Sequence, residues 1–375
     1  MTLFHGGDVL SASQQYDIPT DEWIDLSTGI NPCAYPLKQT LRDIDLACFE
    51  KLPYLQPDFL ESVESYYGSR HFLAVPGTQS AIQLIPASLN QAEPTIPVIL
   101  PSLGYQEHEH AWRINSKHTY YDANDLDMAT TAIDAQLAQN PSQHLVVINP
   151  NNPTDQQFSV RQLQQWASML KGGGHLVVDE AFIDSKPECS LLSQPLANNV
   201  IVLRSFGKFF GLAGIRVGFV FANQDILNFL GIRIGPWSIN GPAQAIVTRA
   251  CHDIEWQLSA REKIGRAAQL SQLLFSNLFS RLSVKKVAHS CLFSSYWLEN
   301  KTAQSLFEFF ACRGLLIRCL PIDNNETIVR IGCVNPESKQ EIASLKGILR
   351  QAEKVFGEHD QIKRVELKNL RKQNA

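Results

Sequence analysis

The stretch "SFGKFFGLAGIRVGF", residues 205 to 219, places one lysine and one arginine in an otherwise apolar, glycine-rich segment. Because a charged side chain that leaves water must be paired or used in chemistry, Lys208 and Arg216 both need a reason to be there. A partly desolvated lysine has a lowered pKa and becomes an amine nucleophile, whereas arginine stays charged and its planar fork suits phosphate. Taken alone, Lys208 also fits a surface lysine with a packed stem.

Around this stretch, short apolar runs alternate with longer helical patterns. The runs are rich in branched residues, which is typical of strands in a parallel sheet that is buried on both faces. They cover residues 96–100, 144–150, 175–183, 199–206 and 217–222. Helices are predicted at 78–89 and 159–173, the second with Ser159 as its N-cap. The sequence therefore predicts an α/β sandwich over roughly residues 65–250.

The pattern changes after residue 250. A long helix is predicted at 256–282, followed by shorter strands at 291–299 and 327–334, which is typical of a separate α+β domain. A chain of 375 residues is also longer than a single core usually grows. The basic tail, 361–375, is interpreted as a solvated helix end, and no function is assigned to it.

These patterns predict a division of the chain into three parts. They are an N-terminal segment that joins the small domain, 1–50, a large domain, 51–265, and a small C-terminal α+β domain, 266–375.

Composition narrows the classes of partner. Hydrophobic residues make up 44% and charged residues 19%, as in an ordinary soluble enzyme. A net charge of -4 gives no reason to expect nucleic acid or an anionic membrane as partner. Eight scattered cysteines without a C-x-x-C pair or a cysteine–histidine cluster indicate reduced thiols and no metal. The N-terminus lacks a basic region followed by an apolar run, so we expect no signal peptide and a cytoplasmic protein.

Two polar turns follow predicted strands, and ligands bind at the carboxyl ends of strands in open parallel sheets. In "PGTQSAI", residues 76–82, a glycine permits close backbone approach before a helix start, which is a seat for phosphate. A turn capped by Thr78 would have the same sequence. In "NPNNPT", residues 149–154, prolines stop any helix and hold the asparagines in a defined turn. An ordinary asparagine turn is an equal interpretation.

Asp179 ends the apolar strand of "VVDEAFID". A carboxylate at that place must find a cation or several donors. It is therefore either the partner of a ligand's protonated nitrogen or the N-cap of a helix.

Together these clusters follow one order along one sheet, and the set matches a single cofactor, pyridoxal 5′-phosphate (PLP). Its aldehyde suits Lys208, its pyridine nitrogen suits Asp179 and its ring hydroxyl suits Asn152. Its phosphate suits the Gly77–Thr78 turn, Ser205 and Arg216. The lysine of the opening stretch is thus predicted to do chemistry, and the arginine to anchor phosphate.

With these residues, the chain resembles fold-type I PLP enzymes of the aspartate aminotransferase superfamily, from "INP" at residue 30 to "VRIGCVNP" at residue 336. Within that superfamily it is similar to the branch that holds histidinol-phosphate aminotransferase and threonine-phosphate decarboxylase. The start, "HGGDVL" followed by "WIDLSTGINPCAYP", resembles the decarboxylase. The resemblance implies a large domain with a mainly parallel seven-stranded sheet between helices, a smaller α+β domain and a homodimer.

The resemblance also implies roles for individual residues. Lys208 binds the cofactor covalently, Asp179 pairs with the ring nitrogen, and Asn152 hydrogen-bonds the ring oxygen. Further contacts to the cofactor are implied for Thr78 and Gln79 at the phosphate, for Tyr105 stacked on the ring as a catalytic residue, and for Tyr54, which reaches the phosphate of the neighbouring subunit. Implied contacts to a phosphorylated amino acid substrate are Asn31 and Arg330 on its carboxylate, and His5 and Arg318 on its phosphate.

One position departs from related transaminases, which commonly carry tyrosine three residues after the aspartate. Here that residue is Phe182, and a donor to the ring oxygen is lost. Together with the "HGG" start, this favours decarboxylation of L-threonine O-3-phosphate to (R)-1-amino-2-propanol O-2-phosphate in cobalamin biosynthesis. The alternatives are an aminotransferase of histidinol-phosphate type and a PLP-binding scaffold without turnover.

Overall fold

The computed structural model describes residues 5–90 and 95–373, with 358–373 by their backbone alone. The chain divides into two compact units, one formed by residues 34–260 and a smaller one formed by residues 1–33 and 261–375. The N-terminal segment of the smaller unit therefore ends at residue 33, whereas residue 50 was expected, and the second boundary lies at 260, where 265 was expected.

Residues 34–50 belong to the larger unit because their side chains and backbone pack on it. The Tyr35 amide donates to the Phe210 carbonyl at 2.9 Å, and the Tyr35 ring lies edge-on to Trp256 at 5.0 Å. Further along, Gly241 approaches the Cys48 carbonyl so closely that a Cβ at position 241 would clash with it. Sequence periodicity carries no signal for such packing.

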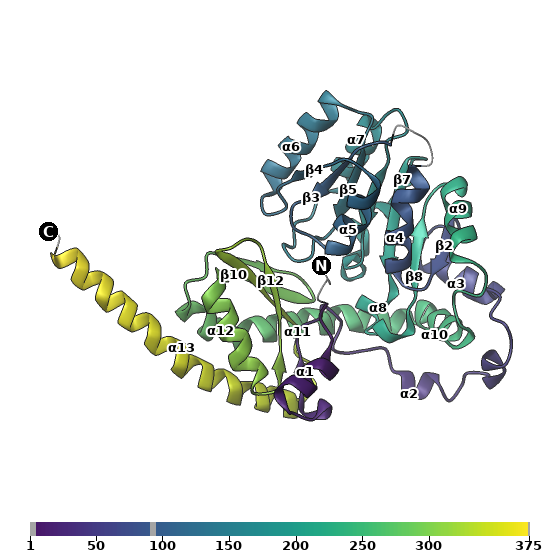
Figure 1. Ribbon diagram of the computed structural model, residues 1–375. Helices are drawn as coiled ribbons and strands as arrows, with labels where there is room; N and C mark the ends of the chain where they lie inside the picture. The colour runs from purple at the N-terminus through teal and green to yellow at the C-terminus, as the bar shows by residue number, and fades with distance from the viewer. Residues whose placement is uncertain (1–4, 91–94, 374–375) are drawn as a thin grey trace. The chain divides into compact units, whose positions relative to one another are not determined.

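A seven-stranded sheet forms the centre of the larger unit, in the order β2-β8-β7-β6-β5-β3-β4 (Figure 1). The strands are β2 Phe72–Val75, β3 Val98–Pro101, β4 His118–Tyr121, β5 His144–Ile148, β6 Leu176–Asp179, β7 Val200–Ser205 and β8 Gly218–Phe221. β4, β3, β5, β6 and β7 run parallel to one another, whereas β8 pairs antiparallel with both β7 and β2. The prediction of a mainly parallel sheet of seven strands is confirmed.

The direction of β8 corrects one expectation. The run 217–222 has the composition of a buried parallel strand, and β8 is indeed fully buried, but it runs antiparallel. The reason lies in the preceding link, which forms the single-turn helix α8, Phe206–Phe209, and a 3-10 turn at Ala213–Ile215. A parallel return needs a crossover that spans the length of the sheet, and these short turns do not supply one.

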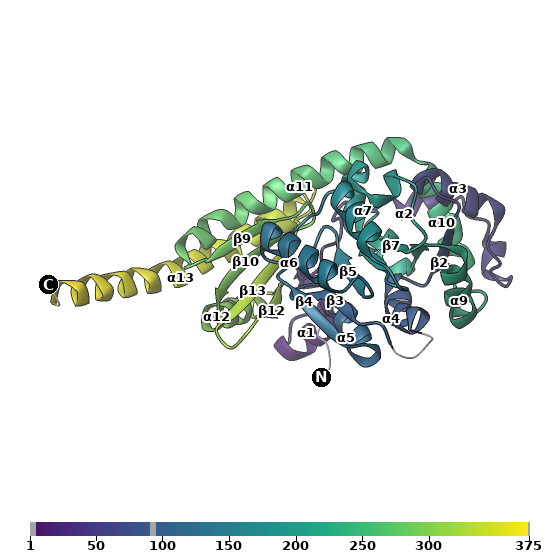
Figure 2. The ribbon, with the colours of Figure 1, turned by 90° about the horizontal axis from the view of Figure 1, so that it is seen from above.

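Helices cover both faces of this sheet, and Figure 2 shows α4 and α5 on one side with α6 and α7 on the other. The helices of the larger unit are α2 Leu37–Thr40, α3 Pro57–Tyr67, α4 Thr78–Leu89, α5 Gln106–Asn115, α6 Leu126–Gln139, α7 Val160–Met169, α8, α9 Gln224–Ile234 and α10 Gly241–His252. Two of them, α4 and α7, match the predicted helices.

Every second side chain of each strand points to the face of the sheet that α4 and α5 cover. Val177 of β6 and Leu203 of β7 lie in one apolar cluster with Ile82 of α4 and Trp112 of α5. Side chains two positions further along each strand point to the same face. That face is therefore the one on which Asp179 and Ser205 stand at the strand ends.

The smaller unit is an α+β structure, as expected. Its four-stranded sheet has the order β12-β13-β10-β9 and is antiparallel, and β1 pairs with β11 in parallel. The strands are β1 Ile24–Asp25, β9 Lys286–His289, β10 Phe293–Glu299, β11 Leu315–Leu316, β12 Arg318–Pro321 and β13 Glu326–Gly332. The helices are α1 Val9–Tyr16, α11 Ile254–Arg281, in which the boundary between the units falls, α12 Asn300–Ala311 and α13 Lys339–Gln373.

Helix α7 offers a test of the local sequence signals. Ser159 is its N-cap, and the Ser159 side chain accepts a hydrogen bond from the Gln162 amide at 3.2 Å. Ser159→Ala removes that acceptor, so we expect the free energy of unfolding in urea to fall by about 1 kcal/mol. Ser168→Ala on the same helix is the control, because the Ser168 hydroxyl only donates back to the Gln165 carbonyl. Equal losses in the two variants would contradict the capping role.

Candidate active site

Strand register brings two distant segments of the larger unit together. β2 pairs with β8 through Val75 and Gly218, and β8 pairs with β7 through Gly218 and Ser205. Gly218 must lack a side chain, because a Cβ there would lie 2.8 Å from the Thr78 amide nitrogen. The turn after β2 and the end of β7 therefore meet across Gly218.

The turn after β2 forms a cradle for an anion. Gly77 has a φ of +76°, which L side chains rarely adopt, and a Cβ there would clash with the guanidinium of Arg216. Gly77 is also the N-cap of α4, so Thr78 is the first helical residue and the alternative of a turn capped by the Thr78 side chain is wrong. The guanidinium thus lies beside unpaired N–H groups of a helix start, an arrangement that suits phosphate.

Lys208 lies on α8, directly after β7. Phe206 and Phe209 on the same turn are fully buried and hold it in place, whereas Lys208 is half-buried. Its Nζ lies 5.7 Å from the centre of the Phe182 ring. The position that carries tyrosine in related transaminases is therefore beside the lysine amine, and here it offers an aromatic face without a hydroxyl.

Asp179 is buried at the end of β6, with 3% of its surface exposed. Its Oδ2 lies 2.9 Å from Nε2 of His108, and its Oδ1 accepts from the Ala181 amide at 3.0 Å. No helix starts on Asp179 within the described chain, so the N-cap alternative is wrong. Two carboxylate oxygens have four acceptor sites, so a further donor can still bind.

His108 is the residue of this site that the sequence analysis missed. It is buried on α5, and it contacts Asp179 across 71 positions of sequence. Its only signal is the place of "HEH" just after the predicted ring-stacking Tyr105, and that signal does not tell which histidine turns inward.

The asparagine turn is tied to the end of β6. The Asn149 amide donates to the Asp179 carbonyl at 2.8 Å, and the Asn149 side chain bonds the backbone of Phe158. The Asn151 side chain donates to the Leu103 carbonyl at 2.9 Å. These two asparagines hold the turn, which leads to the half-buried Asn152. The contact of Asn152 with a cofactor stays a prediction.

Tyr105 and Gln79 contact each other in the larger unit, and their contacts with a cofactor stay predictions. The Tyr105 hydroxyl donates to Oε1 of Gln79 at 2.9 Å, and its ring lies edge-on to His108 at 6.4 Å. Tyr105 therefore contacts both Gln79, next to the Gly77 turn, and His108, the partner of Asp179.

In the smaller unit, two arginines lie directly opposite each other. Arg318 of β12 pairs with Arg330 of β13 across the antiparallel ladder. The pKa of Arg330 is lowered to about 10, chiefly by burial and also by the like charge of Arg318, whereas Asp25 acts in the opposite direction. Like charges at such a position repel, so the pair favours an anion between them.

Gly6 and Gly7 of the N-terminal "HGG" pack on Ser27, which is bonded to Arg330. The Gly7 amide donates to the Ser27 hydroxyl at 2.7 Å, and the Ser27 carbonyl accepts from Nη2 of Arg330 at 2.6 Å. Asn31 is buried in the same unit, where its side chain accepts from the Cys33 amide. His5 is exposed, next to Gly6.

Tyr54 is the candidate that the larger unit does not bring to the cradle. It is 65% exposed, and its ring lies edge-on to Trp237 at 6.1 Å. Its expected contact is with another subunit, and it stays a prediction.

Comparison with known sequences finds matches over most of the chain. The model of the family "Aminotransferase class I and II" matches residues 22–344. A threonine-phosphate decarboxylase from Pseudomonas aeruginosa is 35% identical over 84% of this chain and 89% of its own.

Solved structures show the same fold at low sequence identity. A histidinol-phosphate aminotransferase from Sinorhizobium meliloti, in complex with pyridoxal-5′-phosphate, has a TM-score of 0.76 at 17% identity, over 94% of this chain and 96% of its own. An L-threonine-O-3-phosphate decarboxylase from Porphyromonas gingivalis has a TM-score of 0.68 at 18% identity, over 89% of this chain and 99% of its own. Among the described residues, no helix is both long enough and apolar enough to cross a bilayer. With the family model matched over most of its length, the chain belongs to the aminotransferase class I and II family.

Proposed function

We propose that this protein is a PLP-dependent decarboxylase that converts L-threonine O-3-phosphate to (R)-1-amino-2-propanol O-2-phosphate in cobalamin biosynthesis. The structural observation that carries the proposal is the cross-strand pair of Arg318 and Arg330, with the "HGG" start linked to Arg330 through Ser27. An amino acid phosphate carries two anionic groups, and the pair supplies two guanidinium groups. The relative from Pseudomonas aeruginosa is named threonine-phosphate decarboxylase.

The residues of the larger unit fit PLP. A Cβ at Gly77 would fill the space beside the Arg216 guanidinium, so the turn is shaped for close approach of a ligand to the backbone. Ser205 lies across Gly218 from that turn, on the face that also carries Asp179. Phosphate donors, a buried carboxylate and a lysine thus belong to one edge of one sheet. PLP, when bound, supplies an aldehyde for an amine and a ring that withdraws electrons from the substrate Cα.

Each residue of this set has a separate task. Lys208 would hold the aldehyde of the cofactor through its amine, and the same amine would hold the proton that replaces the lost carboxylate on Cα. Asp179, fixed by His108 and the Ala181 amide, accepts a hydrogen bond from the ring nitrogen and keeps it protonated. Asn152 would bond the ring oxygen, and Tyr105 would cover the ring.

The orientation in which the substrate is bound selects which bond to its Cα breaks. Arg330 orients the carboxylate through paired charge-assisted hydrogen bonds, with Asn31 as a further donor, and Arg318 and His5 bind the phosphate. Because CO2 is neutral, the attraction between Arg330 and the carboxylate fades as the bond breaks. Arg330 therefore serves orientation more than rate.

The direct test is product identification with the PLP-loaded protein. Threonine phosphate should release CO2 without any 2-oxo acid, and aminopropanol phosphate should accumulate. The aminotransferase alternative expects no CO2 and conversion of the bound cofactor to its amine form by glutamate alone. A cofactor spectrum without turnover of either substrate would favour the scaffold.

The active form is proposed to be a homodimer with shared sites. Residues 41–60 of the larger unit expose several large apolar side chains, among them Leu46 at 68%, Phe49 at 64% and Tyr54 at 65%. A second copy of the chain would cover them, and Tyr54 would then reach the phosphate in that copy. The cytoplasmic location stays a prediction.

The roles proposed for Lys208 and Asp179 predict different defects when each residue is replaced. Lys208→Ala is expected to abolish turnover and covalent attachment of PLP while the protein stays folded. Asp179→Asn should keep the attachment but lower kcat by about 100-fold, since the ring nitrogen is no longer held protonated. Attachment is measured by borohydride reduction, and Lys171→Ala, an exposed lysine of the same unit, is the control. Near-normal rates in either site variant would refute the roles.

Shared sites predict complementation between two inactive proteins. Lys208→Ala and Tyr54→Ala each lack a different residue of the site. If Tyr54 acts in the neighbouring subunit, mixed dimers contain one site with both residues intact, and activity should return after unfolding and refolding the two together. Each variant refolded alone serves as control. No gain on mixing, with dimers present by sedimentation, would show that Tyr54 acts within its own subunit or not at all.

A further inference from the structure

We propose that Arg204, Glu180 and Asp184 form a positioning unit that keeps Asp179 and Lys208 in register. This inference rests on the proposed function, because it concerns the same two residues. The three side chains lie behind the site, and none of them is assigned a role in the proposed chemistry.

Their place follows from the alternation along two neighbouring strands. Asp179 ends β6 on the face toward α4 and α5, so Glu180, the next residue, points to the opposite face. Likewise, Arg204 of β7 stands opposite to Ser205. Glu180 and Arg204 are backbone neighbours as well, because the Glu180 amide donates to the Leu203 carbonyl at 2.9 Å. Asp179 and Ser205 on one face, and Glu180 and Arg204 on the other, are therefore neighbours along the same two strands.

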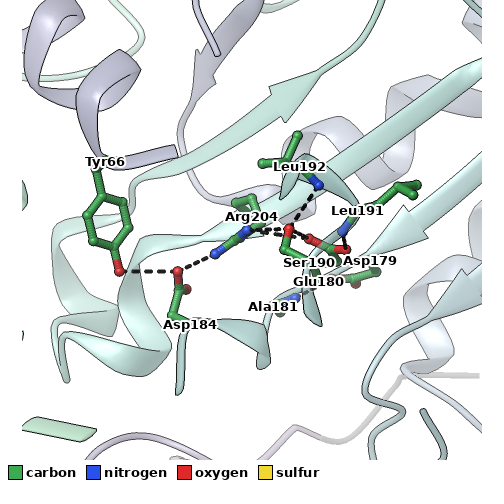
Figure 3. Close-up of polar contacts among 9 residues, drawn as sticks. All are labelled: Tyr66, Asp179, Glu180, Ala181, Asp184, Ser190, Leu191, Leu192 and Arg204. Carbon is green, nitrogen blue, oxygen red and sulfur yellow. Dashed lines mark hydrogen bonds and ion pairs between the residues drawn. The ribbon is translucent and has the colours of Figure 1, made fainter. Parts of the chain in front are cut away.

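The cluster is a buried bridge between the two strand ends (Figure 3). Nη1 of Arg204 lies 3.4 Å from Oε2 of Glu180 and donates to the Ser190 hydroxyl at 2.9 Å. Its Nη2 pairs with Oδ1 of Asp184. All three charged side chains are at most 3% exposed. One planar guanidinium thus connects the residue after Asp179, the loop that follows β6, and the strand that leads to Lys208.

The two carboxylates have further donors. Glu180 accepts from the Leu191 amide at 2.7 Å and from the Ser190 hydroxyl at 2.5 Å, and Asp184 accepts from the Tyr66 hydroxyl at 3.3 Å. Burial raises the pKa of Glu180, and Arg204 opposes that shift. Burial alone would lower the pKa of Arg204, but Asp184 and Glu180 raise it, so the guanidinium stays charged.

A second path links the cluster to α8. The Tyr66 ring packs on Phe210 at 5.6 Å, and Phe210 stacks on Phe206 at 4.0 Å, which begins the turn that carries Lys208. The guanidinium carbon of Arg204 lies 4.7 Å from the centre of the Tyr67 ring. Tyr66 therefore contacts both the charged cluster and the aromatic side chains that hold the lysine turn.

Stability alone does not explain these charges. Replacing a buried ion pair by well-packed neutral side chains is often neutral or stabilising, because two ions must be taken out of water. A guanidinium bound to fixed partners has a narrow range of geometries, which neutral side chains do not impose. Because a misplacement of about 1 Å can cost about 100-fold in rate, fixing the spacing of Asp179 and Lys208 affects the reaction directly.

The decisive variant neutralises the whole cluster, Arg204→Met with Glu180→Gln and Asp184→Asn. It leaves no unpaired buried charge, and the new amides can still accept from Tyr66, Ser190 and the Leu191 backbone. We expect the thermal midpoint of the apoprotein to stay close to the parent's, and kcat for CO2 release to fall by about 100-fold with little change in KM. The absorbance titration of bound PLP should move to higher pH. A loosened Asp179 leaves the ring nitrogen less protonated, and loss of that like charge favours the proton on the Lys208 nitrogen.

Two further variants keep the inference falsifiable. Arg204→Lys retains a charge but loses the planar fork of donors, so we expect the same changes in kcat and in the absorbance titration. This variant tests the proposal if the triple variant does not fold. Trp166→Phe removes a partly buried hydrogen bond to Asp134 in the same unit, and it should lower the thermal midpoint without moving the titration. A folded triple or lysine variant with the parent's kcat and titration would overturn the proposal. PLP binding by the parent is measured first, so failure of the proposed function is recognised separately.

Discussion

The site depends on one constraint, the register in which β2, β8 and β7 pair. Val75, Gly218 and Ser205 occupy one row across the three strands. This row brings the Gly77 turn against the residues that follow β7, and it sets Arg216 beside that turn. A shift of register by one residue would point Ser205 to the opposite face, so the anion cradle and the lysine turn are fixed by backbone pairing before any ligand binds.

The same strand ends serve two purposes on two faces. Toward α4 and α5 they carry Asp179 and Ser205. On the opposite face they carry Glu180 and Arg204, which Figure 3 shows joined to each other. Reactive groups at an active site are often held by groups that never meet the substrate. Here a buried guanidinium between β6 and β7 fills that position, because it connects the two strands that supply the aspartate and the lysine.

Much of this was readable from sequence, because single residues after apolar strands are local signals. That signal predicts the mainly parallel sheet, which is confirmed, and it selects Asp179, Lys208 and the Gly77 turn as site candidates. The direction of β8 was not, since an apolar run has the same composition in either direction. His108 and Arg204 were missed because their partners lie far along the chain or on the hidden face of a strand. The periodicity of apolar residues in the sequence indicates neither of these contacts.

The proposed chemistry requires a covalent bond between Lys208 and the aldehyde of PLP. The most direct measurement is mass spectrometry of peptides after the PLP-loaded protein is reduced with borohydride and digested. The cofactor mass is expected on the peptide that contains Lys208, and on no other lysine. Modification of a different lysine, or a fully loaded protein without any modified peptide, would contradict it.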